Sequence, residues 1–278
     1  MDRQGRTLAE LPVPEGEILG VDVSPDGAVL VTRTEELSAA MGLWVVRGQN
    51  AQRIGSGPGR YIVPAWSSDG KWIYFASYDG TGLHRRSPEP GGEEELVLRR
   101  GPGDLNIQSV TRDGRYAFGT AIDATTNRGY DICRLDLHSR VRTAWSATEA
   151  DEARPALSPD ESWIAWQSDA GGGRLRVSPR DDPSNITYVS MTPAFEPRWS
   201  RDGRELYYLA PNGWLHSVPI AINHGRVDAG VPERLFQLCD GHRFGRRYAV
   251  ESANRFLVRD VYRRPPDPVL VWRPSGVH

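Results

Sequence analysis

Short apolar segments alternate with polar turns along the whole chain, and one polar turn recurs. Its copies read VSPDG, WSSDG, VTRDG, LSPDE and WSRDG, and they contain Asp26, Asp69, Asp113, Asp160 and Asp202. By subtraction, these aspartates are 43, 44, 47 and 42 residues apart, and a degraded sixth copy carries Asn254 a further 52 residues on. A period of this length, without long helical patterns between the copies, is typical of a solenoid or a propeller.

Each repeat unit contains the pattern of four short strands. One apolar strand enters the turn, a second leaves it, a third follows a polar turn, and a weaker fourth ends the unit. The second unit shows this order as YIVPAW, WIYFAS, GLHRRS and EELVLRR. Four strands in a unit of this length are the content of a propeller blade. The second strands are apolar at nearly consecutive positions, because a blade between two others has no free face.

The recurring turn has a structural explanation. Its aspartate can accept backbone N–H groups, its glycine takes positive φ, and Pro25 and Pro159 preset the backbone in two copies. A catalytic constellation is normally assembled once, so the copy number indicates that Ser200 and Asp202 form a hairpin turn. Glu161 replaces the glycine in the fourth copy. Positive φ is unfavourable for such a residue, so we expect that turn to be rearranged.

The pattern predicts an all-β fold, a six-bladed β-propeller with four-stranded antiparallel blades. We expect residues 1–278 to form a single domain, whose blades begin near residues 18, 61, 105, 152, 195 and 246. The sixth unit supplies RRYAVE, RFLVRDV and DPVLVWR and then stops one strand short. We therefore expect residues 6–11, RTLAEL, to complete the last blade and close the ring.

Charge and composition narrow the classes of partner. The formal net charge is −2 and the pI about 6.3, so no global electrostatic argument favours nucleic acid or an anionic membrane. No apolar run reaches the ~20 residues of a membrane helix, and the first residues lack the apolar stretch of a signal peptide. The chain as given is expected to be cytoplasmic. The alternative is a periplasmic location within a longer exported protein.

The recurring WSxDG, followed by WIYFAS or LYYLA, resembles the repeat of TolB-like six-bladed propellers, which are of the PD40 or WD40-like type. The resemblance covers essentially the full chain. The segment EPRWSRDGRELYYLAPNGWLHSVPI, followed by VDAGVPERLFQL, resembles the carboxy-terminal propellers of bacterial serine/threonine kinases and winged-helix regulators. In such proteins the propeller is a noncatalytic interaction or sensing module. The resemblance implies the same role here, including as part of a larger signalling protein.

The sequence lacks the common motifs that place catalytic or metal-binding residues at fixed spacings. No G-x-S-x-G nucleophile elbow is present, the six histidines form no HxxxH or HExxH pair, and the two cysteines form no CxxC. The stretch GSGPGR lacks the GxGxxG spacing and leads into a strand. We therefore expect no catalytic residue, no metal and no cofactor. The alternative is a hydrolase or lyase with its active site at the mouth of the channel.

The inner strands of a propeller all start at one rim of the channel, so we place the binding site there. The candidate residues are Arg60, Tyr61, Asn106, Glu152, Arg154, Glu196, Arg246, Arg247 and Tyr248. This polar set suits a protein or peptide partner, or a small anionic ligand, bound by a monomeric propeller. One alternative is that Arg154 and Glu196, on adjacent blades, merely pair with each other. If the site lies elsewhere, we expect it on the outer surface around Arg259, Arg263 and Arg264.

Overall fold

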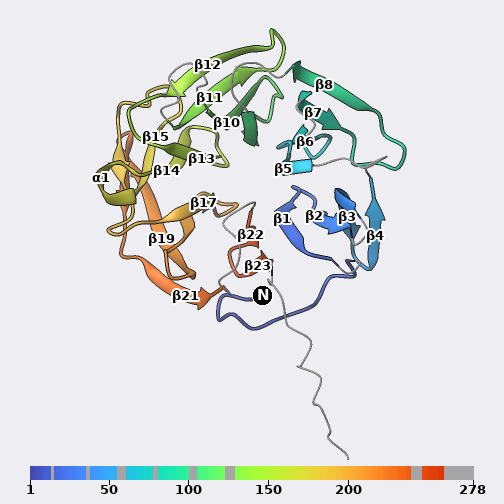
Figure 1. The fold of residues 1–278 in the computed structure, drawn as a ribbon. Coiled ribbons are helices and arrows are strands. Elements are labelled where there is room, and N and C mark those ends of the chain that lie inside the picture. Colours follow the sequence, from blue (N-terminus) through green and yellow to red (C-terminus); the bar gives the residue numbers. More distant parts are fainter. Residues whose placement is uncertain are drawn as a thin grey trace, which may run out of the picture.

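The computed structural model shows sheets arranged around a central axis (Figure 1). It describes residues 1–13, 16–35, 38–54, 61–77, 81–99, 105–122, 129–238 and 246–259. Within these residues the secondary structure consists of antiparallel strands and a single helical turn, α1 (Ala170–Gly173), in which Gly171 and Gly172 have positive φ. The predicted all-β propeller of four-stranded antiparallel blades is therefore confirmed.

Six sheets follow one another along the described chain. The first holds β1 (Ile18–Val23), β2 (Val29–Glu35), β3 (Ser38–Arg47) and β4 (Asn50–Arg53), and the second holds β5 (Tyr61–Trp66), β6 (Ile73–Ser77), β7 (Gly82–Arg86) and β8 (Glu94–Arg99). The third holds β9 (Leu105–Val110), β10 (Tyr116–Ile122), β11 (Tyr130–Asp136) and β12 (Val141–Ser146), and the fourth holds β13 (Glu152–Leu157), β14 (Trp163–Ser168), β15 (Leu175–Pro179) and β16 (Thr187–Tyr188). The fifth holds β17 (Phe195–Trp199), β18 (Glu205–Leu209), β19 (Trp214–Asn223), β20 (Arg226–Ala229) and β21 (Glu233–Gln237), and the sixth holds β22 (Tyr248–Ser252) and β23 (Arg255–Val258). In each sheet the first strand lies nearest the axis (Figure 1).

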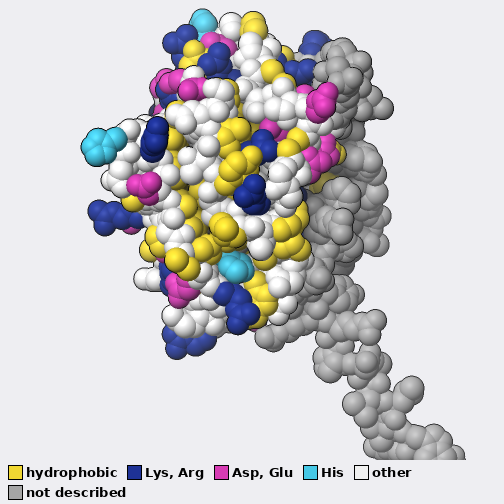
Figure 2. Space-filling model, turned by 90° about the vertical axis from the view of Figure 1, so that its left-hand side faces the viewer, with side chains coloured by type: hydrophobic (Ala, Val, Ile, Leu, Met, Phe, Trp, Pro, Cys, Tyr) yellow, Lys and Arg dark blue, Asp and Glu magenta, His cyan; other side chains and the backbone are white. Residues whose placement is uncertain are grey.

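The hydrophobic core is divided into layers between neighbouring sheets. Phe118 of the third sheet packs with Ile164 and Trp166 of the fourth, and Tyr207 of the fifth packs with Phe256 of the sixth. Each sheet is covered on both faces, which explains the apolar second strands seen in the sequence. On the side of the ring shown in Figure 2, hydrophobic side chains are interspersed with charged ones, as is common on protein surfaces.

The turn between the first two strands of a sheet has one hydrogen-bonding pattern in the first five sheets. The Ser200 hydroxyl donates to Asp202 Oδ1 at 2.6 Å and accepts the Glu205 N–H at 2.9 Å. Gly203, at φ 73°, donates its N–H to Ser200 O at 3.0 Å. The same hydroxyl-to-carboxylate bond is made to Asp26, Asp69, Asp113 and Asp160. Each turn thus satisfies its own polar groups at the end of the inner strand.

The expectation that the turn at Glu161 is rearranged is wrong. Glu161 adopts φ 62° and donates its N–H to Ser158 O at 2.9 Å, as the glycines do in the other turns. Its carboxylate accepts the N–H of Arg112 from the turn of the neighbouring blade. This tertiary hydrogen bond helps to offset the backbone strain of a non-glycine residue at positive φ.

The fifth sheet contains an additional hairpin, which accounts for the longest repeat interval. Strand β19 has ten residues, and its first half pairs with β21 while its second half pairs with β20. His224 and Gly225, both at positive φ, connect β19 to β20. The hairpin adds to this blade beyond β18, so the inner strand β17 still pairs with β18 as the first two strands of the other sheets do.

The amino-terminal segment contacts the last blade differently from our expectation. Residues 6–11 form no strand; instead Met1 and Asp2 lie beside β23, where Phe256 N–H donates to Met1 O at 2.8 Å (Figure 1). The reason is local, because Asp2 Oδ1 accepts the N–H groups of Gln4 and Arg6 and turns the chain away. The predicted third strand of this blade, DPVLVWR, lies outside the described residues.

Arg3 fastens this segment to the fifth blade through a bidentate ion pair with Glu205, with distances of 2.8 and 3.1 Å. Glu205 also accepts the hydroxyls of Tyr207 and Ser217, each at 2.7 Å. Burial acts to raise the pKa of Glu205, but the hydrogen bonds from Arg3, Tyr207 and Ser217 bring it below its ordinary value of 4.5. The ionised form of Glu205 is therefore stabilised in the folded protein.

Arg3→Met should lower the free energy of unfolding by about 1–2 kcal/mol at pH 7, because a half-buried carboxylate loses its charged donor. The pKa of Glu205 is lower in the folded protein than in the unfolded chain. Its ion pair therefore contributes fully to stability at pH values above the pKa of the unfolded chain. The contribution is lost as pH falls through the folded value. The difference between wild type and variant should thus become smaller as the pH is lowered from 7 to 3. Urea denaturation at both pH values measures it.

Arg226→Met is the matched control, since Arg226 is exposed in β20, far from the Arg3–Glu205 pair in the chain. It should change the free energy of unfolding by no more than about 0.5 kcal/mol at pH 7. An equal effect of the two substitutions would show that Arg3 does not fasten the segment.

Asp202→Ala should lower the free energy of unfolding by about 1 kcal/mol, since it removes the acceptor for the Ser200 hydroxyl and the Arg204 N–H. Asp181→Ala, which removes a carboxylate with a 76% exposed side chain, should have an effect within about 0.5 kcal/mol. Chemical denaturation of both variants compares them. Equal stability of Asp202→Ala and wild type would contradict the structural role of the turn.

Candidate ligand-binding site in the central channel

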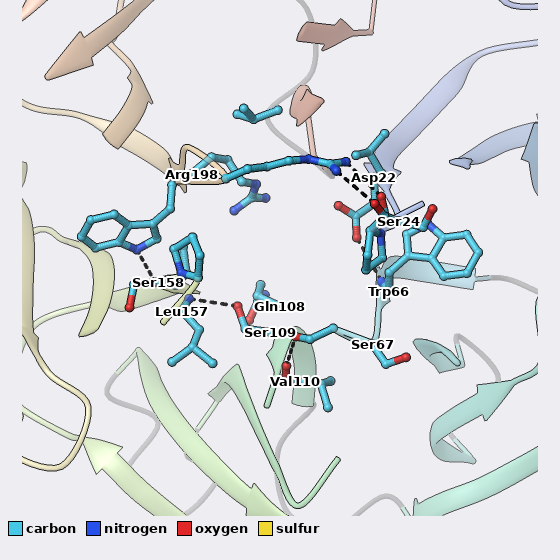
Figure 3. Close-up of a pocket in the computed structure, with 18 of the residues that line it drawn as sticks. Asp22, Ser24, Trp66, Ser67, Gln108, Ser109, Val110, Leu157, Ser158 and Arg198 are labelled. Carbon is cyan, nitrogen blue, oxygen red and sulfur yellow. Dashed lines mark hydrogen bonds between the residues drawn. The ribbon is translucent and has the colours of Figure 1, made fainter. Parts of the chain in front are cut away.

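A cavity of about 380 Å³ lies in the central channel, bounded by the ends of the inner strands and the turns that follow them (Figure 3). All six sheets contribute to its wall. Residues that represent the six sheets in order are Asp22, Ser67, Gln108, Ser158, Arg198 and Arg246. The cavity therefore depends on the ring as a whole, and no single blade could form it.

One register position distinguishes the inner strands chemically. The residues two positions before the first turn residue are Asp22, Ala65, Ser109, Ala156, Arg198 and Val250. Only Asp22 in the first sheet and Arg198 in the fifth are charged. The wall of the cavity thus carries one acid and one base at equivalent positions on different blades.

Arg246 precedes β22 and ties three blades together across the channel. Its Nη1 lies 2.6 Å from Asp22 Oδ2 in the first sheet, and its Nη2 donates to Gln108 O in the third at 2.8 Å. Asp22 Oδ2 also accepts the backbone N–H of Trp66 from the second sheet at 3.0 Å. The Arg246 side chain is only 5% exposed. It stabilises the wall of the cavity, with Asp22 as its counter-ion.

Arg198 has no such counter-ion. Its Nη1 donates to Pro197 O at 2.8 Å, its Nε is buried without a hydrogen-bond partner, and it forms no ion pair with any described residue. Burial lowers the pKa of Arg198 and the nearby charge of Arg246 lowers it further, while the more weakly acting charges of Asp22 and Glu196 oppose this shift. Arg198 therefore introduces a positive charge into the cavity that the described chain leaves without a direct ion pair.

Near the start of the inner strands, four of the predicted residues come together. Buried Glu196 accepts Arg154 Nη1 at 2.7 Å and Arg247 Nε at 2.9 Å, while the Tyr248 hydroxyl donates to Glu196 O at 2.7 Å. Burial acts to raise the pKa of Glu196, but the charges of Arg154 and Arg247 bring it below its ordinary value. Arg154 and Glu196 thus form the ion pair that the alternative interpretation described.

The other predicted residues have different surroundings. Glu152 is completely buried and pairs with Arg176 in its own sheet at 3.2 Å, and Tyr61 packs edge-on against Phe75 at a ring-centroid distance of 4.8 Å. Asn106 is half-buried in β9, and Arg60 lies outside the described residues. Of the nine candidates, Arg246 lines the cavity.

The prediction of a second binding location on the outer surface is wrong for Arg259. Arg259 is 2% exposed and donates to Leu19 O at 2.7 Å, so it joins the sixth sheet to the first. An arginine with this burial offers no outer surface to a partner. Arg263 and Arg264 lie outside the described residues.

Two findings concern the described residues as a set. They contain no group of three or more His, Cys, Asp or Glu side chains that could hold a metal ion. Their helical segment is too short and insufficiently apolar to cross a membrane.

No family model and no curated protein sequence matches the chain, but solved structures do. A protein assigned as TolB in Agrobacterium tumefaciens gives a TM-score of 0.64 at 15% identity, over 88% of this chain and 90% of that chain. A puromycin-hydrolyzing peptidase from Mycobacterium tuberculosis gives 0.61 at 19% identity, over 88% of this chain and 42% of that chain. An oligogalacturonate lyase from Vibrio parahaemolyticus gives 0.59 at 12% identity, over 83% of this chain and 70% of that chain. The chain has the fold of a TolB-like β-propeller.

Proposed function

We propose that the protein is a noncatalytic binding module that captures a small ligand, or a segment of a protein or peptide, in the channel cavity. The observation that carries the proposal is the cavity itself, a polar recess to which all six sheets contribute. Its volume of about 380 Å³ falls in the range of small-molecule sites. A recess of this size accommodates a small ligand or about one or two residues of a peptide.

The cavity wall is held rigidly by hydrogen bonds between neighbouring blades. Leu157 N–H donates to Ser109 Oγ at 3.2 Å, and Trp199 Nε1–H donates to Ala156 O at 2.9 Å. These bonds keep the inner strands in register with one another before a ligand arrives. A preformed site loses less conformational entropy on binding, which favours affinity.

The carboxylates of the cavity already have structural partners. Asp22 is engaged by Arg246 and Trp66, and Glu161 accepts the backbone N–H of Arg112. The described lining contains neither histidine nor cysteine. A general base or nucleophile must be available to a substrate, so these contacts support binding rather than catalysis. The structural neighbours include a protein assigned as TolB and two enzymes, so the fold alone does not decide between a binding module and an enzyme.

Val250→Phe should block the cavity, because Val250 lines it and a phenyl ring fills part of its volume. Ligand-observed NMR with a library of small polar compounds and dipeptides should give binders to wild type whose affinity falls at least tenfold in this variant. Val141→Phe is the matched control, since Val141 is 55% exposed on the outer strand β12. It should bind the same compounds as wild type.

Ser68→Tyr, at an exposed position on the rim of the cavity, gives a second test if Val250→Phe fails to fold. If neither cavity substitution lowers the affinity of the compounds that bind wild type, the binding site lies elsewhere. Stoichiometric metal in the purified protein, together with hydrolase or lyase turnover that Val250→Phe abolishes, would overturn the noncatalytic assignment.

A further inference from the structure

Arg198 is the residue of the cavity that the proposed binding role does not yet explain. Its side chain projects from the inner strand of the fifth sheet into the recess (Figure 3). The described chain supplies one acceptor for it, the carbonyl oxygen of Pro197, and leaves its buried Nε without a hydrogen bond. Arg198 is half-buried, and a cation that is partly removed from water without a direct ion pair carries a desolvation cost, so its presence in the cavity calls for a physical explanation.

Asp22 forms a direct ion pair with only one of the two arginines of this layer, Arg246. Its Oδ2 lies 2.6 Å from Arg246 Nη1 and accepts Trp66 N–H at 3.0 Å, so it is committed to the first, second and sixth sheets. Two guanidinium groups therefore face one carboxylate in the deep part of the cavity. The surplus is one positive charge, which matches one carboxylate group of a ligand.

The rim carries a similar surplus. Arg112 donates to Pro159 O at 2.9 Å, and Arg201 donates to Pro25 O at 3.0 Å, so both use uncharged acceptors. Glu161 is the acid of the lining at this level. The rim can therefore attract negative charge toward the deeper Arg198.

We propose that the cavity recognises a carboxylate-bearing ligand and that Arg198 is the residue that pairs with the carboxylate. The inference rests on the proposed function, because it uses the same cavity. A guanidinium suits this task since its planar donors match the two oxygens of a carboxylate. The carboxylate belongs either to a small organic acid or to an acidic residue or terminus of a peptide, and these two sources share the chemistry that Arg198 selects.

Succinate is the first probe, with succinamide as its uncharged counterpart, both titrated by calorimetry at constant ionic strength in sodium chloride. Wild type should bind succinate, and succinamide should bind at least tenfold more weakly. A short peptide with a carboxy-terminal aspartate, compared with its fully amidated form, tests the second source. Equal binding of the charged and uncharged members of both pairs would overturn the proposal. Inorganic phosphate that binds as tightly as succinate would overturn the preference for a carboxylate.

Arg198→Met keeps most of the side-chain length and removes the charge. It should weaken succinate or acidic-peptide binding at least tenfold, and Arg198→Lys should retain part of the affinity. Arg204→Met is the matched control, because Arg204 is exposed on the adjacent turn and does not line the cavity. Undiminished carboxylate binding by Arg198→Met would contradict the assignment.

Stability without ligand separates a binding arginine from a structural one. Loss of an uncompensated cation should leave the melting temperature of Arg198→Met equal to or above that of wild type. A fall of more than about 5 °C would indicate that Arg198 serves the fold instead. Wild type could bind neutral compounds that Val250→Phe excludes and yet bind no carboxylate. This result would contradict the inference about Arg198 but not the proposed binding function.

Discussion

The buried ion pair between Arg246 and Asp22 connects the closure of the ring to the channel site, because it joins the last blade to the first within the wall of the cavity. A propeller must bring its last blade against its first, and the last sheet has only two described strands for this purpose. Arg246 joins that sheet to the first and third, while Asp22 also holds the second. Because the pair is buried, its desolvation cost is offset only when all these partners are in place. Closure should therefore be cooperative across several blades.

Two neighbouring charge clusters along the inner strands differ in how their charges are paired. At the end where the inner strands begin, Glu196 is surrounded by Arg154 and Arg247, so its charge is neutralised within the protein. At the end where the inner strands finish, Arg246 occupies the carboxylate of Asp22, and Arg198 keeps its charge without an ion pair among the described residues. One cluster is thus a structural clamp between blades. The other contains Arg198, whose charge we propose is available to a ligand.

Much of this architecture can be predicted from the repeat, because a recurring turn with flanking apolar strands reports a local structure. The inner strands begin at Ile18, Tyr61, Leu105, Glu152, Phe195 and Tyr248. The possible pairing of Arg154 with Glu196 could also be inferred, since equivalent positions on adjacent blades lie side by side. The turn at Glu161 could not, because its hydrogen bond to Arg112 comes from another blade.

The location of the cavity was not predictable from the same pattern. Periodicity places Arg246 at the start of an inner strand, but it does not specify that its long side chain reaches Asp22 and Gln108 within the channel. Likewise, Arg198 appears in the sequence as one more arginine of a strand. A comparison of the position two residues before each turn could have identified it, since Asp22 is the only other charged residue there.

A high-resolution crystal structure of the protein with succinate tests the central claim most directly. The account predicts that Asp22 remains paired with Arg246 and that a succinate carboxylate lies within hydrogen-bond distance, about 2.7–3.0 Å, of the Arg198 guanidinium. An Arg198 side chain paired with Asp22, or succinate bound away from the cavity, would contradict it.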